Sequence, residues 1–189
     1  LGTLFLNSGF LRTIDDRLET KSYAGYANAS FAITPTLRLS GGLRYTKETK
    51  DYDRTTSTFY SNAIINSLFA KTFAFAPPKG KWNDWSPMAS IDWQVTPNAM
   101  LYARVAKGFK SGGFNGRANE AASATAYQPE TVWSYEAGFK SRIANQLTLN
   151  GAIFDNEYKD FQARISANAG EFEDIPSPVL SVVNAGKLR

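Results

Sequence analysis

The chain of 189 residues contains no cysteine and no histidine. Without cysteine, disulfide bonds and thiolate metal sites are excluded. Without histidine, the chain lacks the commonest acid–base catalyst and the commonest metal ligand, and a Ser–His pair cannot form. We therefore expect no enzyme, no metal site and no cofactor.

Long hydrophobic runs are also missing. No window holds the 18 or more consecutive apolar residues of a membrane-spanning helix, and the mean hydropathy is −0.33. The strands of a membrane β-barrel alternate between lipid and lumen, so their average is mildly polar as well. Two classes stay open at this point: a soluble all-β domain, or part of a barrel wall.

Charge and the start of the chain add two constraints. The net charge of +4 is spread along the sequence without a dense Lys/Arg run, so nucleic acid is not an expected partner. A basic exterior is compatible with an anionic membrane surface. The sequence opens Leu1-Gly2-Thr3 without an initiator Met or a charged leader. Either the start was processed, or the chain is a piece of a longer protein.

What the sequence does contain is apolar–polar alternation with a period of two. In the segment Leu37–Lys47, Leu39, Leu43 and Tyr45 fall on one side and Arg38 and Arg44 on the other. Successive side chains of a β-strand point to opposite faces, so this segment predicts a strand with one apolar and one charged face. Five further strands are expected at Lys21–Ile33, Trp85–Val95, Ala99–Phe109, Trp133–Arg142 and from Leu147 onward.

The last two expected strands need separate comment. The alternation that starts at Leu147 changes phase near Asp155, which predicts a β-bulge or a strand that leaves the membrane. A seventh strand is expected to begin near Val179 and to continue to Arg189.

The connections between the expected strands alternate between short and long. The short ones are 34–36, 96–98 and 143–146, which are rich in turn-forming Pro, Asn and Thr. The long ones are 48–81, 110–128 and 166–178. Short turns at one end and long loops at the other are typical of outer-membrane barrels, and strands of about 9–11 residues are long enough to cross a bilayer when tilted.

Aromatic residues gather near the expected strand ends, where amphipathic rings favour the headgroup level and form girdles. Trp93 lies near a short turn. The residues near the long-loop ends are Tyr45, Trp82, Trp85, Phe109, Trp133 and Tyr135.

Several motifs then point to a family. The run 101–115 (LYARVAKGFKSGGFN) resembles a segment of TonB-dependent receptors, and 127–140 (YQPETVWSYEAGFK) is similar to the strand that follows it in that family. The segments 39–46 (LSGGLRYT), 147–162 and 183–187 (VNAGK) are similar to other strands of the same wall, and all occur in family order. The resemblance covers roughly residues 22–189, with the loops unmatched.

This resemblance implies an all-β fold, an antiparallel transmembrane β-barrel of 22 strands in the cell outer membrane. It also implies an N-terminal plug domain in the lumen and energy supplied through the TonB complex. Residues 1–189 provide about seven of these strands, whereas the plug, the TonB-contacting segment and the closing C-terminal strands are missing. We therefore expect a barrel-wall fragment, since about seven strands cannot close so large a barrel.

The expected long loop 48–81 is unusually rich in aromatic residues, and exposed apolar surface of this kind often marks a binding site. The alternative is that the loop packs over the barrel mouth. Together with two basic positions in the next long connection, the candidate ligand-binding residues are Tyr52, Phe59, Tyr60, Phe73, Phe75, Lys110 and Arg117.

The charged face of the expected strands forms a second candidate group, which we interpret as facing the lumen and the plug rather than the ligand. A pairing of Arg44 with Glu136 across the wall is one hypothesis that charge reversal would test. The members are Arg38, Arg44, Asp92, Arg104, Glu136, Lys140 and Arg142.

The resemblance thus implies an active outer-membrane transport receptor that takes up a scarce small ligand, such as a ferric siderophore or a saccharide, by TonB-driven rearrangement of a plug. Its expected partners are outer-membrane lipid and lipopolysaccharide, the ligand, and the TonB complex through a plug outside this chain. Two alternatives remain: a passive porin-like channel without a plug, and a soluble β-rich carbohydrate-binding module.

Overall fold

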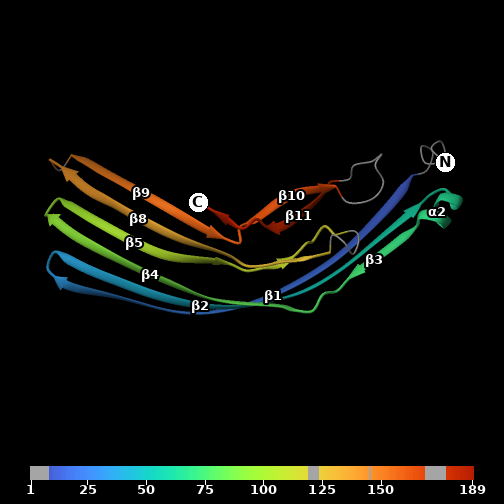
Figure 1. Ribbon diagram of the computed structural model, residues 1–189, viewed down its shortest axis with the longest axis horizontal. Helices are drawn as coiled ribbons and strands as arrows, with labels where there is room; N and C mark the ends of the chain where they lie inside the picture. The colour runs from blue at the N-terminus through green and yellow to red at the C-terminus, as the bar shows by residue number, and fades with distance from the viewer. Residues whose placement is uncertain (1–8, 119–123, 145, 169–177) are drawn as a thin grey trace.

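The computed structural model describes residues 9–118, 124–144, 146–168 and 178–189. Most of them form one antiparallel sheet with the strand order β1-β2-β4-β5-β8-β9-β12, in which β3 pairs with β2 (Figure 1). The strands of this sheet are β1 (Phe10–Thr34), β2 (Leu37–Tyr60), β3 (Lys71–Phe75), β4 (Gly80–Thr96), β5 (Ala99–Lys110), β8 (Glu130–Ile143), β9 (Leu147–Lys159) and β12 (Lys187–Leu188). The remaining elements are the helix α2 (Ala63–Phe69) and two small hairpins, β6 (Gly113–Phe114) with β7 (Ala126–Tyr127) and β10 (Gln162–Asn168) with β11 (Pro178–Asn184).

The alternation of short and long connections is confirmed where the structure describes it; residues 119–123, 145 and 169–177 of the expected connections lie outside the described residues. The turns between β1 and β2, β4 and β5, and β8 and β9 gather at one end of the curved sheet, and α2, β3 and the β10–β11 hairpin lie toward the other end (Figure 1). At the first two turns the register shifts by one residue, next to Pro35 and Pro97. Both prolines lie in the turns themselves, where a residue without an N–H to donate interrupts no ladder hydrogen bond.

The connection expected as a loop over 48–81 is mostly regular structure, so that prediction is wrong. Strand β2 continues to Tyr60, α2 and β3 follow, and β4 already starts at Gly80. The continuation was missed because its outward positions are Thr, Ser, Asp and Lys rather than apolar residues. Threonine nevertheless favours strands, because its branched side chain fits a pleated surface. Strand β1 likewise begins at Phe10 rather than near Lys21.

All six long strands follow one simple rule. The antiparallel partners pair even with even and odd with odd positions, for example Arg38 with Asp92 and Leu39 with Ile91. Even-numbered residues of β1, β2, β4, β5, β8 and β9 therefore share one face, which we call the charged face. Odd-numbered residues share the other, which we call the apolar face.

The apolar face is open rather than packed. Leu39 and Leu43 are 40% and 43% exposed, and Ile153 is 78% exposed. Among the described residues, the buried hydrophobic ones are only Tyr52, Ile65 and Ala118. A soluble domain would bury such a continuous apolar surface, so the carbohydrate-binding alternative does not fit this fold. The open apolar face fits a protein whose surface is covered by the hydrocarbon of a membrane.

The border of the apolar face shows how the strands are tilted. On β2 the last apolar residue of this face is Tyr45, and the next outward residue is Lys47. On β9 the last apolar residue is Ile153, and the next outward residue is Asp155. The register carries Ile153 through Ala137, Ala103 and Ile91 to Leu39, which lies six residues before Tyr45 (45 minus 39). From β9 to β2, the border therefore shifts by six residues, about 20 Å along the strand direction, over four strand spacings, which are about 19 Å across the sheet. Two nearly equal shifts at right angles mean that the border is inclined by about 45° to the lines of register partners. This is the strand tilt of a transmembrane barrel.

The phase change near Asp155 had two interpretations, a β-bulge or a strand that leaves the membrane. The bulge is wrong, because β8 and β9 stay in register from Ile143–Leu147 to Thr131–Lys159. The second interpretation fits the apolar border, which ends at Ile153 on β9. The strand expected from Val179 first pairs with β10 as β11, and only β12 joins the main sheet. In the described part of the chain, no helix is long and apolar enough to span a membrane.

Candidate ligand-binding site on the charged face

Beyond Tyr45, β2 carries its buried residues on the charged face. Tyr52 is 5% exposed and Arg54 is 4% exposed, and Thr56 and Thr58 are also buried. The outward neighbours Asp53 and Thr55 are exposed. The segment Lys47–Tyr60 therefore lies outside the apolar band, with its charged face covered by other parts of the chain.

Aromatic rings from four elements cover this face. Phe114 of β6 stacks on Tyr52 with ring centroids 5.8 Å apart and planes 9° apart. Phe75 of β3 meets both rings edge-on, at 6.1 Å and 6.4 Å, and Trp82 of β4 lies 6.1 Å from Phe114. Offset and edge-to-face contacts of this kind are favourable beyond the buried area. We call Tyr52, Phe75, Trp82 and Phe114 the aromatic cluster.

Lys50 lies at the margin of the aromatic cluster. Its ammonium group is 5.6 Å from the centroid of the Trp82 ring, and it donates hydrogen bonds to Ser111 Oγ at 2.9 Å and to Gly112 O at 2.8 Å. It also forms an ion pair with Glu48 at 3.1 Å, and Ser111 donates to the same carboxylate. Cation–π contact and these bonds hold one positive charge at the edge of an aromatic surface.

A buried guanidinium anchors the covering loop. Arg54 Nη1 donates to both carboxylate oxygens of Asp16, at 2.8 Å and 2.7 Å, and to Gly116 O at 2.6 Å. The Tyr52 hydroxyl donates to Asp16 at 3.1 Å. The Arg54 guanidinium thus links β2 to β1 and to the loop after β6. A buried charge needs hydrogen-bond partners of this kind.

Two ionisable groups of this segment, outside the apolar band, respond to their surroundings. For Glu48, burial raises the pKa, but hydrogen bonds from Ser111 and Lys50 outweigh it and leave the pKa lowered. For Tyr52, burial raises the pKa of the phenol. Glu48 is therefore held as a carboxylate and Tyr52 as a neutral hydroxyl donor.

Gly112 explains why the loop fits so closely. A Cβ atom at this position would lie 2.6 Å from Trp82 Nε1 and would also collide with the Tyr127 carbonyl oxygen. Only glycine lets the backbone approach the indole ring and present its carbonyl oxygen to Lys50.

Amide side chains connect this loop to the β10–β11 hairpin. Asn115 is 3% exposed and binds the backbone of Val182 in both directions, accepting from its N–H at 2.6 Å and donating to its carbonyl oxygen at 3.3 Å. Gln162 donates to Ser111 O and Gln128 O, at 3.0 Å each, and the Gln162 N–H binds Glu130 at 2.8 Å. The motif residues thus form a buried polar network, which no pattern in the sequence predicts.

The structure brings together only part of the ligand-binding residues predicted from sequence. Tyr52 and Phe75 belong to the aromatic cluster, and Phe73 lies beside it on the same face of β3, opposite Thr56. Phe59 points to the opposite face and is 47% exposed, and Tyr60 contacts Phe10 at the end of β2. Lys110 lies 3.8 Å from Glu130, and Arg117 is exposed. Lys50, Trp82 and Phe114 were not among the predicted ligand-binding residues.

Trp82 also corrects the expected girdle, because it lies on the charged face and not among the outward rings. Tyr45 and Trp85, with ring centroids 4.7 Å apart, and the stacked pair Trp133 and Tyr135 are on the apolar face.

The seven charged residues predicted to face the lumen all have even numbers and lie on the charged face. Arg38 is opposite Asp92, and Arg104 is opposite Glu136. The Tyr102 hydroxyl donates to Glu136 at 2.6 Å, and the Lys140 ammonium group is 5.6 Å from the Tyr102 ring centroid. Arg44 donates to Thr46 at 3.1 Å, and Arg142 lies opposite Thr148 near a short turn.

The hypothesis that Arg44 pairs with Glu136 is wrong. Arg44 lies on β2 and Glu136 on β8, with β4 and β5 between them. Three strand spacings alone are about 14 Å, so the two side chains cannot form an ion pair.

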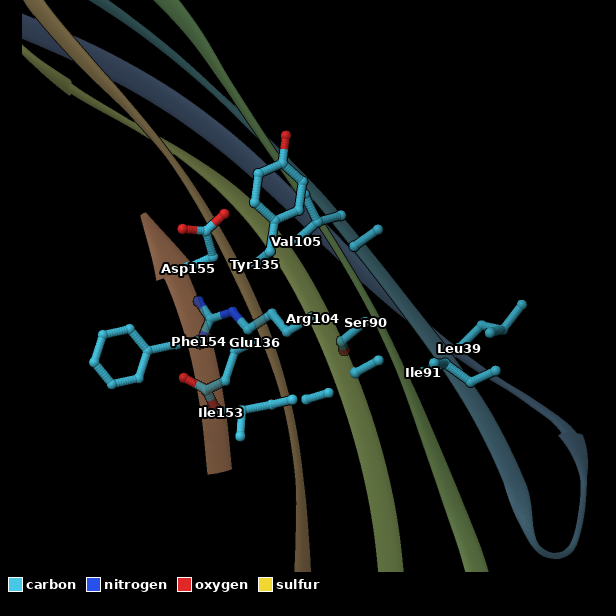
Figure 2. Close-up of a pocket in the computed structure, with 13 residues that line it drawn as sticks. Leu39, Ser90, Ile91, Arg104, Val105, Tyr135, Glu136, Ile153, Phe154 and Asp155 are labelled. Atoms are coloured by element: carbon cyan, nitrogen blue, oxygen red, sulfur yellow. The ribbon is translucent and has the colours of Figure 1, made fainter. Parts of the chain in front are cut away.

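The apolar face has its own depression. A groove of about 600 Å³ crosses five strands along the row Leu39, Ile91, Ala103, Ala137 and Ile153 (Figure 2). The two alanines leave it shallow between larger neighbours. Because it is part of the membrane-facing surface, we do not assign it to a water-soluble ligand. Among the described residues, no group of three or more Asp and Glu is arranged to hold a metal ion.

Comparison with known proteins identifies the family. A family profile described as "TonB dependent receptor-like, beta-barrel" matches residues 2–189. The chain belongs to the β-barrel family of TonB-dependent receptors. This membership places the barrel wall in the outer membrane of the cell, and the homologues are receptors rather than enzymes.

Relatives of this TonB-dependent receptor barrel are themselves receptors. The pesticin receptor of Yersinia pestis is 26% identical over 144 residues, which are 75% of this chain and 19% of the relative. That of Yersinia enterocolitica is 25% identical over the same length. The chain therefore spans about a fifth of the length of the curated relatives.

Solved structures share the fold. The ferric yersiniabactin uptake receptor FyuA from Yersinia pestis has a TM-score of 0.66 at 21% identity, covering 80% of this chain and 22% of that one. The ferric-catecholate import receptor Fiu from K12 E. coli has a TM-score of 0.60 at 19% identity, covering 91% of this chain and 24% of that one.

Proposed function

We propose that the receptor containing this chain takes up a ferric siderophore across the outer membrane, with energy supplied through TonB. The chain contributes wall strands and the extracellular structures above them, and a plug domain elsewhere in the protein provides the moving part. The observation that carries the proposal is the aromatic cluster with Lys50 at its margin, on the charged face, toward the end where the long connections gather.

The chemistry of this surface suits a ferric siderophore. Such ligands combine flat or apolar groups with oxygen ligands and frequently carry negative charge. Lys50 and Trp82 offer a cation beside an aromatic face, and the exposed Arg117 and Lys110 add positive charge nearby. Related receptors named for ferric yersiniabactin and ferric catecholates favour this class over a saccharide.

Tyr52 acts in this proposal as a support and not as a ligand contact. It is buried under Phe114 and tied to Asp16. The same holds for Arg54. The alternative that the aromatic residues pack over the barrel is therefore adopted for Tyr52, and ligand contact is assigned to the margin, at Lys50 and Trp82.

Binding and transport by the intact receptor test the proposal. Cells that produce it should accumulate iron from a ferric catecholate or a mixed-ligand ferric siderophore, and accumulation should stop when TonB is deleted. Lys50→Gln with Trp82→Leu should weaken ligand binding at least about tenfold, whereas Lys71→Gln, an exposed lysine of β3 away from the cluster, should leave it unchanged.

Uptake that continues without TonB would contradict the transport mechanism. Preference for an oligosaccharide over every ferric siderophore tested would contradict the ligand class. Equal effects of the Lys50/Trp82 and Lys71 variants would contradict the assignment of the site.

A further inference from the structure

Three lysines form a triangle on the apolar face, just beyond its aromatic border. Thr49 on β2 is the register partner of Lys21 on β1 and of Lys81 on β4, so these two lysines flank it. Two strand spacings separate their Cα atoms by about 10 Å. Lys47, two residues along β2, completes the triangle around the Thr49 hydroxyl.

The triangle lies at the height of the lipid headgroups. Lys47 is the first outward residue beyond Tyr45, and Lys21 is the first beyond Tyr23. With a rise of about 3.3 Å per residue and a tilt of about 45°, Lys47 is about 5 Å above the last apolar ring. Tyr45 and Trp85 directly below it form the aromatic border, which marks the membrane interface.

Little negative charge compensates the three ammonium groups. Lys21 forms an ion pair with Glu19 at 2.8 Å, and the nearby Asp51 is occupied by Lys79 at 2.8 Å. Within the part of the chain that the structure describes, Lys47 and Lys81 form no ion pair with a carboxylate. Both are exposed. Like charges held this close repel one another unless an anion lies between them.

The lysines are also distributed unequally between the two ends of the apolar face. At the short-turn end, the outward residues of the described strands are apolar or uncharged, such as Ile33, Trp93, Ile143 and Leu147. The lysines and arginines at that end, Arg38, Lys140 and Arg142, lie on the charged face. Positive charge therefore meets only one leaflet, the one beside the long connections.

We propose that Lys21, Lys47 and Lys81 bind the phosphate group of a phosphorylated lipid of the outer leaflet. The ammonium groups supply point charges for the phosphate oxygens, and the Thr49 hydroxyl supplies a donor between them. The acyl chains of the same lipid lie against the apolar face below, beginning at Tyr45 and Trp85. The inference rests on the family and its membrane location, and it is independent of the ligand that the receptor transports.

Native mass spectrometry of the intact, purified receptor titrated with diphosphoryl lipid A tests this proposal. Lys47→Gln with Lys81→Gln should weaken binding at least about tenfold, since each lysine near an anionic headgroup contributes about fivefold. The matched control is Lys159→Gln with Lys187→Gln, another pair of neighbouring outward lysines, which lies farther beyond the apolar border. It should change affinity less than about twofold.

Two further arms identify the group that is recognised. Lipid A without phosphate should bind at least about tenfold more weakly than the diphosphoryl form, and Lys47→Arg with Lys81→Arg should restore binding. Unchanged binding by the Gln variant, or an equal loss in the control pair, would overturn the proposal. Competition by millimolar inorganic phosphate would also overturn it, because the site would then select the free anion and not the lipid.

Discussion

The two halves of strand β2 use the same backbone for opposite purposes. From Leu37 to Tyr45, the odd positions are apolar and exposed or half-buried, and no part of the chain that the structure describes covers them. From Lys47 to Ser57, the odd positions are polar, and the even positions from Tyr52 to Thr58 are buried under side chains of β3 and β6 and the loop after β6. The first half is stabilised by the surrounding hydrocarbon, whereas the second is stabilised by contacts within the chain.

This comparison predicts the largest difference between two matched substitutions on β2. Leu39→Arg places a charge in hydrocarbon near the middle of the band and should destabilise the folded barrel by about 2–4 kcal/mol. Thr55→Arg, on the same face of the same strand, should cost less than about 0.5 kcal/mol, because Thr55 is exposed to water. Denaturant unfolding of the intact receptor in lipid bilayers measures both. Equal destabilisation by Leu39→Arg and Thr55→Arg would mean that hydrocarbon and water do not surround the two halves of β2 as described.

The stability of the second half of β2 should depend on Arg54, as the stability of the first half depends on its apolar side chains. Arg54→Met removes the hydrogen bonds that the buried guanidinium donates to Asp16 and to Gly116 O and should destabilise the segment Lys47–Tyr60 by about 2–3 kcal/mol. Arg17→Met on β1, whose side chain is 77% exposed, serves as the control. Hydrogen exchange of the amides in 111–118 should accelerate in the first variant alone. Unchanged hydrogen exchange in the Arg54→Met variant would show that Arg54 does not hold the loop 111–118 in place.

Substitution of Gly112 should reduce stability, although glycine has no side chain to lose. Gly112→Ala forces the backbone away from Trp82 and Tyr127 and should cost about 1–3 kcal/mol, with weaker ligand binding. Gly25→Ala on the apolar face meets no atom within 4 Å and should be tolerated. A crystal structure of Gly112→Ala that retains the contact of Lys50 with Gly112 O would contradict this prediction.

The smallest effect is expected at Tyr52. Tyr52→Phe keeps the stacking on Phe114 and loses one hydrogen bond to Asp16, which should cost about 1 kcal/mol. Tyr52→Leu also removes the ring and should cost more. If both variants were equally stable, the aromatic contact would contribute nothing.

The sequence predicted the apolar half of the wall well, because period-two alternation of Leu, Tyr, Ile and Trp has a direct physical cause. It did not predict the second half of β2. There, Lys50, Tyr52 and Arg54 alternate with Thr49, Asp51 and Asp53, so hydropathy carries no signal. The buried side was created by a loop that starts more than fifty residues later in the chain.

The motifs were recognised before their roles were visible. Gly112 and Asn115 belong to the run that pointed to the family, and Gln162 to another. Only the three-dimensional structure shows that Gly112 lets the loop approach Trp82 and that Asn115 binds Val182 of a separate hairpin. Such contacts depend on side-chain geometry between distant segments, which a single sequence does not encode in a readable period.

The central claim is that odd-numbered residues of the wall face lipid and even-numbered residues face water. Because the chain has no cysteine of its own, single cysteines at each position from 37 to 45, spin-labelled in the intact receptor in bilayers, test it directly. Accessibility to oxygen should peak at 37, 39, 41, 43 and 45, and accessibility to a water-soluble nickel complex at the even positions between them. A profile without this two-residue period, or with the faces exchanged, would contradict the account.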